Sequence, residues 1–217
     1  MPVITNHMKV INNALGLIGA GKIMAEDEDT DLAAQVVPVY YSRLKALLAM
    51  HEWSFAGKTY KLDAIAKTAE NDYDAAAQIF NNGWRYAFAL PGTRIGNPRK
   101  VLRDPRNPRD PLRDFLIESG WLYADRDQVW AVVTVMPDPS VWDAQFALAM
   151  ERVAAADFCV PVTHDDGLAR SIRAVAEGTP EEQGRGGLIG RAMATDAAKA
   201  RTATAQWRDP LTDARLT

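Results

Sequence analysis

The hydrophobic pattern of this chain changes from a helical period to a strand-like one and back again, and that change limits the folds open to it. From residue 31 to residue 51, apolar side chains recur every three or four residues, as on one face of an α-helix. After Trp53, short apolar and aromatic stretches lie between glycines and prolines, as in strands and turns. Helical spacing returns after Asp138. The pattern predicts a mainly α, α+β fold in which an antiparallel β-lobe is inserted into a helical bundle.

The first predicted helices have recognisable ends. Residues 5–18 carry apolar side chains on one face, have Thr5 or Asn6 as N-cap, and are followed by glycines. Residues 31–51 form a longer helix whose apolar stripe is wide enough to pack against more than one neighbour. Pro38 lies inside it and removes one backbone hydrogen bond, which predicts a kink.

Helix is predicted again from Asp138, because an Asp N-cap followed by proline is a common helix start. This helix is expected to run to residue 158, and another to start near Thr163 or Asp165. A glycine-rich gap at residues 177–187 precedes an alanine-rich last helix over residues 188–205.

Between the helical regions, several short segments are typical of strands. Residues 84–90 alternate aromatic or apolar side chains with others and end at a proline. Residues 115–118 and 121–123 flank Ser119-Gly120, which predicts a hairpin, and residues 130–135 are rich in β-branched side chains.

Residues 91–113 are predicted to form a long loop, because they contain five prolines and seven basic residues. The basic residues are Arg94, Arg99, Lys100, Arg103, Arg106, Arg109 and Arg113. A solvated surface loop accounts for this composition, and the functional alternative is contact with DNA in a channel or with an acidic partner surface. No aromatic residues are interleaved with the basic ones, unlike in a stacking platform for single-stranded nucleic acid.

The predicted organisation is a helical bundle made of residues 1–52 and 138–205, an inserted β-lobe at residues 53–137, and an extended C-terminal tail at residues 206–217. Arg208-Asp209-Pro210 stops any helix in the tail. The residues expected to anchor the tail to a partner are Trp207, Arg208, Leu211 and Leu216. Trp207 is a large apolar side chain whose expected use is burial in a partner, and a loose chain end without a role is the alternative.

Composition excludes several classes of protein. The net charge of −3 gives no general attraction to nucleic acid or to an anionic membrane. Cys159 is the single cysteine, so no internal disulfide is expected, and its apolar surroundings predict a buried small side chain. No apolar run approaches the length of a membrane span, and the first residues do not resemble a signal peptide. The chain is therefore expected to act and assemble in a reducing cytoplasm.

No motif predicts catalysis, a metal or a cofactor. Residues 16–23 match the spacing of a phosphate-binding loop except at Ile23, where the motif requires Ser or Thr to hold magnesium, and they follow a predicted helix rather than a strand. His7, His51 and His164 lie in separate segments without a second ligand at metal-binding spacing. The sequence therefore favours a non-enzymatic protein.

The order of aromatic and apolar landmarks resembles that of the head-to-tail adaptors of tailed bacteriophages, also called head–tail connectors or tail tubular protein A. The first landmark is Tyr40-x-x-Arg43-x-x-x-Leu47-Leu48-x-x-x-x-Trp53-x-Phe55-Ala56. Next come Trp84-Arg85-Tyr86-Ala87-Phe88-x-Leu90-Pro91, then Trp142-x-x-x-Phe146-x-x-Ala149 followed by Ala154-Ala155 and Pro161-x-Thr163, and finally Ala192-x-x-x-Asp196-Ala197. The glycine-rich gap at residues 177–187 departs from the continuous last helix of that family.

The resemblance implies a structural virion protein at the head–tail junction. Such a protein would form a ring, by resemblance of twelve copies, that binds the portal protein on one side and the tail nozzle or another tail component on the other, and helps to form the DNA channel. Two alternatives remain at this stage: a cytoplasmic helical interaction module that is not part of a virion, and a small cell-wall hydrolase.

Overall fold

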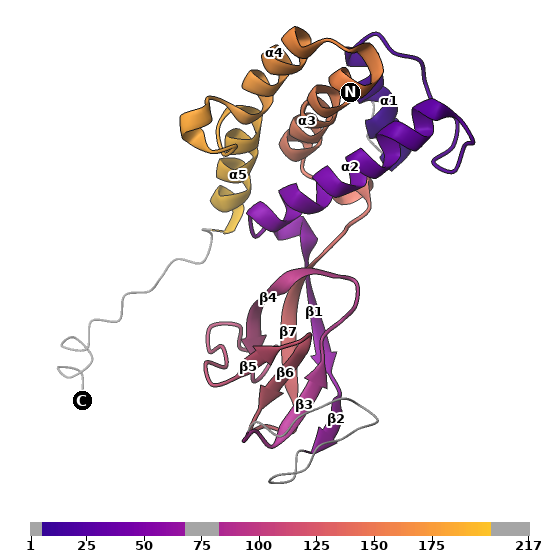
Figure 1. Cartoon of the computed structure of the whole chain (residues 1–217). Helices are drawn as coiled ribbons and strands as arrows, with labels where there is room; N and C mark the ends of the chain where they lie inside the picture. The colour runs from indigo at the N-terminus through magenta and orange to yellow at the C-terminus, as the bar shows by residue number, and fades with distance from the viewer. Residues whose placement is uncertain (1–5, 68–82, 201–217) are drawn as a thin grey trace, which may run out of the picture.

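The computed structural model describes residues 6–67 and 83–200, which form a helical lobe and a β-lobe joined by a narrow neck (Figure 1). This is the α+β fold with an inserted antiparallel β-lobe that the hydrophobic pattern predicted. The helices are α1 (His7–Leu17), α2 (Asp31–Met50), α3 (Ala144–Thr163), α4 (Asp166–Glu177) and α5 (Gly187–Ala200).

Helix α3 is the centre of the helical lobe and packs against all four other helices. Ten of its side chains are buried, including Phe146, Met150 and Phe158, so the helix is apolar around most of its circumference. Cys159 is among them, and burial raises the pKa of its thiol. The expected role of Cys159 as a small core side chain is confirmed.

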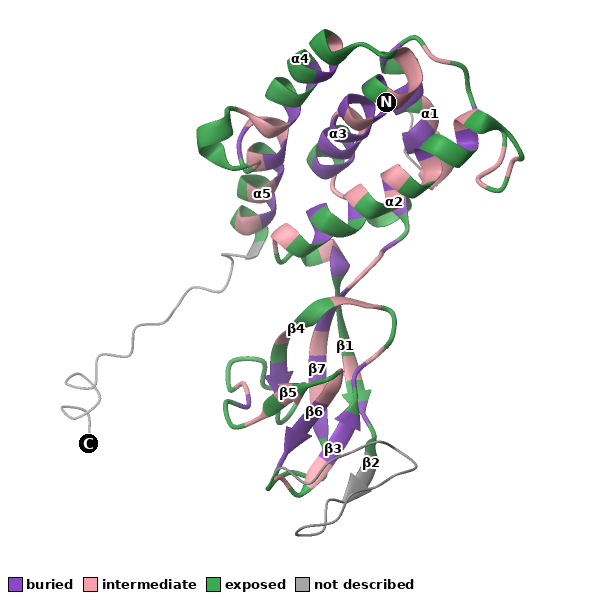
Figure 2. Ribbon diagram, viewed as in Figure 1, coloured by how far each residue is buried: buried purple, intermediate pink, exposed green. Residues whose placement is uncertain are grey.

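The β-lobe contains two antiparallel sheets. One has the strand order β1 (Gly57–Leu62), β7 (Val129–Val135), β4 (Arg94–Leu102). The other has the order β2 (Ala64–Lys67), β3 (Tyr86–Ala89), β6 (Trp121–Ala124), β5 (Leu116–Glu118). Side chains of both sheets, among them Phe88, Leu122 and Val133, share one core. Buried residues of the lobe are purple in Figure 2. The predicted hairpin is the β5–β6 pair.

The prediction of one long loop over residues 91–113 is wrong. Residues 94–102 form β4, which pairs with β7, and the loop proper begins at Arg103. The strand tolerates Pro98 because its register shifts between Ile95 and Lys100, and within this bulge a missing N–H breaks no ladder bond. Gly96, with φ of +71°, supplies the left-handed residue that the bulge needs.

The ends of the later helices also differ from expectation. Asp138 caps a short 3₁₀ helix at Pro139–Val141, and α3 starts only at Ala144, with Asp143 as its N-cap. The glycine-rich gap is real: α4 ends before Gly178 and α5 begins at Gly187.

His7, the first residue of α1, contacts aromatic side chains of α2 and of the segment before α3. They are Tyr40, Tyr41 and Trp142. The Nδ1 atom of His7 is 2.9 Å from the Tyr40 hydroxyl, and its ring meets Trp142 edge-on at 5.7 Å between centroids. Burial lowers the pKa of His7, although the Glu26 and Asp138 carboxylates act in the opposite direction. The folded protein therefore favours neutral His7.

We expect the free energy of unfolding to fall as the pH decreases through about 6.5, the ordinary pKa of histidine. The unfolded chain binds a proton at His7 in this range, whereas the folded chain binds it only at lower pH. In His7→Gln this part of the pH dependence should disappear. Urea denaturation of both proteins between about pH 7.5 and 5.5 measures the free energy of unfolding as a function of pH. If it changes equally with pH in the unaltered protein and in His7→Gln, His7 is not the group responsible.

Candidate partner-binding site

The seven basic residues predicted to share one loop do different things in the structure. Arg94 is half-buried on β4, and its Nη1 donates a hydrogen bond to the Pro91 carbonyl oxygen at 3.2 Å. Arg99 is half-buried in the neck. The other five side chains are exposed, on β4 or on the loop that follows it: Lys100, Arg103, Arg106, Arg109 and Arg113.

Arg99 connects the β-lobe to the helical lobe. Its Nε donates to Thr134 Oγ1 at 2.8 Å, and its Nη1 donates to the Trp53 carbonyl oxygen at 2.9 Å. Burial lowers the pKa of the Arg99 guanidinium, and the nearby Glu52 and Asp196 carboxylates oppose this shift. Because these contacts hold two chain segments together, Arg99 is a structural residue rather than a free contact for DNA.

Asp196 fastens α5 to the same neck. Its buried carboxylate accepts hydrogen bonds from the Ser54 backbone N–H at 3.0 Å and from Ser54 Oγ at 2.5 Å, and it lies 3.3 Å from His51 Nε2. The end of α2, the first turn of the β-lobe and the last described helix therefore meet at one carboxylate. The sequence marked Asp196 only as a landmark of the last helix.

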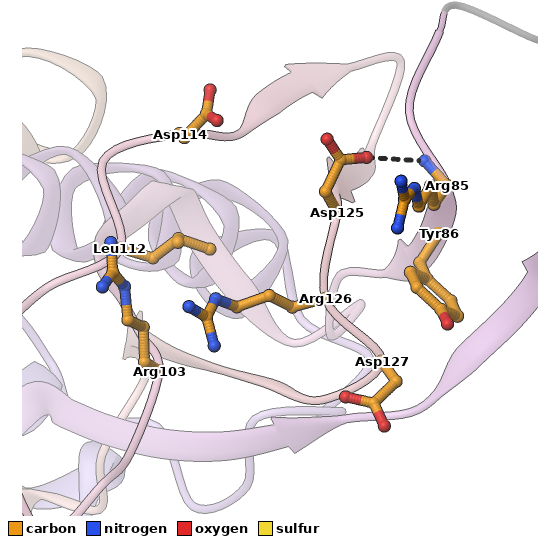
Figure 3. Close-up of a pocket in the computed structure, with 8 residues that line it drawn as sticks. All are labelled: Arg85, Tyr86, Arg103, Leu112, Asp114, Asp125, Arg126 and Asp127. Carbon is orange, nitrogen blue, oxygen red and sulfur yellow. Dashed lines mark hydrogen bonds between the residues drawn. The ribbon is translucent and has the colours of Figure 1, made fainter.

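Arg103 lines a pocket of about 440 Å³ in the β-lobe (Figure 3). The pocket lies where β4 and β6 end and β3 begins. Three arginines and three aspartates line it, with Leu112 and Tyr86 as its less polar wall: Arg85, Arg103, Arg126, Asp114, Asp125 and Asp127. In Figure 3 the guanidinium of Arg126 extends toward Arg103. We call this the arginine pocket.

Sequence reasoning missed Arg85 and Arg126 because both lie outside residues 91–113. Antiparallel pairing of Tyr86 with Ala124 brings the residues next to them together, and the Arg85 backbone N–H donates to Asp125 Oδ1 at 3.0 Å. The equal numbers of positive and negative side chains leave little net field to attract a uniformly anionic DNA backbone. Such a mixed pattern instead favours a protein surface with complementary charges.

The segment with phosphate-loop spacing covers the end of α1 and the turn that follows it. Ile23 is buried there, and its backbone N–H and carbonyl bond to the side-chain amide of Asn12 at 3.0 and 2.9 Å. Within residues 6–67 and 83–200, no three His, Cys, Asp or Glu side chains are grouped to hold a metal ion. Among the same residues, no helix is long and apolar enough to cross a membrane.

No model of a known protein family matches the sequence, and no curated protein matches it. The predicted tail anchors, Trp207, Arg208, Leu211 and Leu216, lie outside the described residues.

Proposed function

We propose that this chain is a non-enzymatic structural protein of tailed bacteriophages, a head-to-tail adaptor. The observation that carries the proposal is that landmarks far apart in the sequence form one aromatic cluster. The ring of Phe146 lies 4.7 Å from that of Trp53, 4.9 Å from that of Phe55 and 5.0 Å from that of Trp142, measured between centroids. The family-like spacing of these residues therefore corresponds to a shared packing need at the neck.

The polar landmark Arg43 supports the same reading. From α2 it forms ion pairs with Asp157 of α3, at 3.2 Å, and with Glu177 of α4. Arg173 also reaches Asp157, at 2.6 Å. An arginine in the middle of this helix thus ties three helices together, which gives its place in the motif a physical reason.

The two-lobe architecture suits a protein that connects two different partners. The helical lobe and the β-lobe present separate surfaces, and hydrogen bonds of Arg99 and Asp196 connect them at the neck. In this proposal the chain forms a homododecameric ring at the head–tail junction of the virion, after synthesis in the host cytoplasm. One lobe faces the portal protein and the other the tail nozzle or another tail component. The ring surrounds the DNA channel, so that contact with packaged DNA is non-specific.

Two predicted contacts belong to this proposal. The C-terminal residues 206–217 would dock on the portal through Trp207. The exposed basic residues after β4 would contact a protein surface of complementary charge in preference to DNA, because as many aspartates as arginines line the arginine pocket.

Mass spectrometry tests the proposal on purified particles of a tailed phage whose genome encodes the chain. We expect the chain in the particles at a ratio of one copy to one copy of portal protein, as matching rings require. Its absence from particles, with the chain free in the lysate, would favour the non-virion interaction module. Clearing of peptidoglycan in a zymogram by the purified chain would favour the cell-wall hydrolase.

A further inference from the structure

The side chains by which helix α5 packs on the rest of the protein change in character along its length. Ile189 and Ala192 are buried in the apolar core of the helical lobe, and Met193 packs partly against it. Asp196 and Lys199 follow at the same helical spacing, so they lie on the same face of the helix. Among the described side chains of α5, none after Met193 belongs to the apolar core. The inward face is therefore apolar in the first half of the helix and charged in the second.

The first half of α5 is also fixed by close backbone contacts. Gly187 has φ of +54°, and a Cβ there would lie 2.5 Å from the Val175 carbonyl oxygen of α4. A Cβ on Gly190 would overlap the carbonyl oxygen of Arg185, in the turn before the helix. Glycine is the residue that fits such positions, because it has no Cβ. This half of α5 is therefore packed tightly against the end of α4 and the turn between the two helices.

The second half of α5, residues 194–200, ends beside the neck and is attached there through charged side chains (Figure 1). We call these residues the strap. The Asp196 carboxylate accepts the Ser54 backbone N–H at 3.0 Å and the Ser54 hydroxyl at 2.5 Å. The Lys199 ammonium donates to Oδ2 of Asp143, the residue just before α3, and holds the pKa of this carboxyl below its ordinary value. Polar bonds to two separate segments therefore attach the strap where the first half of the helix uses apolar packing.

The two segments that receive the strap are also held by bonds of their own. Asp143 accepts the strap with Oδ2 but caps α3 with Oδ1, which accepts the Gln145 backbone N–H at 2.9 Å. At the neck, Trp53 Nε1 donates to the Leu47 carbonyl oxygen at 2.8 Å, and the Trp53 carbonyl oxygen accepts from Arg99 at 2.9 Å. None of these bonds except that of Oδ2 involves α5. The strap can therefore leave while the cap of α3 and the neck stay intact.

We propose that the strap opens as one unit by local unfolding, releasing Ser54 and Asp143 together, while the first half of α5 stays in place. The inference deepens the proposed function and rests on it in one respect: residues 206–217, proposed to dock on the portal, follow the strap in the sequence. Each residue released from the helix adds up to about 3.5 Å of chain. Opening of the strap thus extends the reach of the docking residues, and the opening itself is a property of the purified chain.

Hydrogen exchange of the purified full-length chain tests the proposal, with the Ser54 amide as reporter. This amide bonds to Asp196 but lies far from α5 in the sequence, so its exchange reports whether the strap is closed. Lys199→Gln removes the other attachment of the strap. We expect the amides of Ser54 and of residues 198–200 to exchange faster by the same factor, about two- to fivefold, as loss of an exposed ion pair produces. The amides of α3 should exchange as before.

Asp143→Asn tests the same attachment from the other side. Asparagine is as good an N-cap as aspartate, so the variant keeps the start of α3 but loses the charge that holds Lys199. We expect the Ser54 amide to exchange faster by a factor similar to that in Lys199→Gln. Since both substitutions remove one interaction, the double variant should exchange no faster than either single variant. The matched control is Arg191→Gln, which removes an exposed positive charge from the first half of α5 and should leave the Ser54 amide unchanged.

Faster exchange at residues 198–200 with no change at Ser54 would overturn the proposal, because the helix end would then fray without releasing Asp196. Equal acceleration at the amides of α3 would also overturn it, because the helical lobe would then unfold as a whole. An effect of Arg191→Gln as large as that of Lys199→Gln would show that charge on α5, not the bond to Asp143, controls the exchange. Absence of the chain from purified particles would contradict the proposed function and leave these exchange measurements unaffected.

Discussion

Replacing Trp53 by alanine is expected to lower the free energy of unfolding by about 3–5 kcal/mol, the usual cost of removing a large aromatic side chain from a core. Trp53 is 1% exposed and packs against Phe146 and His51, and its Nε1 donates to the Leu47 carbonyl oxygen at 2.8 Å. The substitution opens a cavity where the helical lobe meets the neck and leaves the end of α2 without this bond. Urea denaturation followed by circular dichroism measures the loss.

Two controls make this result interpretable. Trp53→Phe keeps most of the packing but loses the indole N–H, so it should cost less than the alanine variant. Trp121→Ala removes a half-buried tryptophan from a small cluster in the β-lobe and should cost less as well. If Trp53→Ala and Trp121→Ala lower the free energy of unfolding equally, packing at the neck contributes no more to stability than packing in the outer sheet.

Local patterns in the sequence were sufficient to predict most helices. Asn6 and Asp165 cap α1 and α4 with their side chains, and such caps act within one turn of the residues that they serve. The glycine-rich gap at residues 177–187 also interrupts the last helix as expected. The start of α3 was placed too early because Asp138 and Asp143 both make N-caps, and only packing decides which of them opens the long helix.

Strand β4 could not be predicted from its composition. Its prolines and basic residues are typical of a loop, and its pairing with β7 depends on a partner more than 25 residues later in the chain. The bulge that accommodates Gly96 and Pro98 is a property of that pairing. Strand propensity is weak compared with such tertiary contacts.

The candidate site was predicted only in part for the same reason. Arg103 was recognised as a possible contact residue, but Arg85 and Arg126 join it through sheet pairing. Arg99 was grouped with the exposed basic residues, although its role depends on Trp53 and Thr134, which are distant in sequence. The number of charged residues can be read from a sequence, but which of them lie close together depends on how the strands pair in the fold.

Asp196 is expected to be the polar residue whose removal costs most. Its carboxylate is 2% exposed and accepts two hydrogen bonds from Ser54, and it also faces His51. Asp196→Ala would remove the acceptor of the Ser54 N–H and hydroxyl and release α5 from the neck. A hydrogen bond to a charged acceptor contributes about 1.5–3 kcal/mol, so a loss of about that size is expected in the free energy of unfolding.

Asp196→Asn retains one carbonyl oxygen as acceptor but loses the charge, so its loss should lie between those of the alanine variant and the unaltered protein. Asp125→Ala is the matched control, because Asp125 is exposed and accepts one backbone hydrogen bond from Arg85, and it should cost less than about 1 kcal/mol. Hydrogen exchange separates a local effect from a global one: in Asp196→Ala the amides of α5 should exchange faster than those of α3, since α3 keeps its packing against the other helices. If α5 keeps its protection in this variant, the carboxylate does not hold the last helix to the neck.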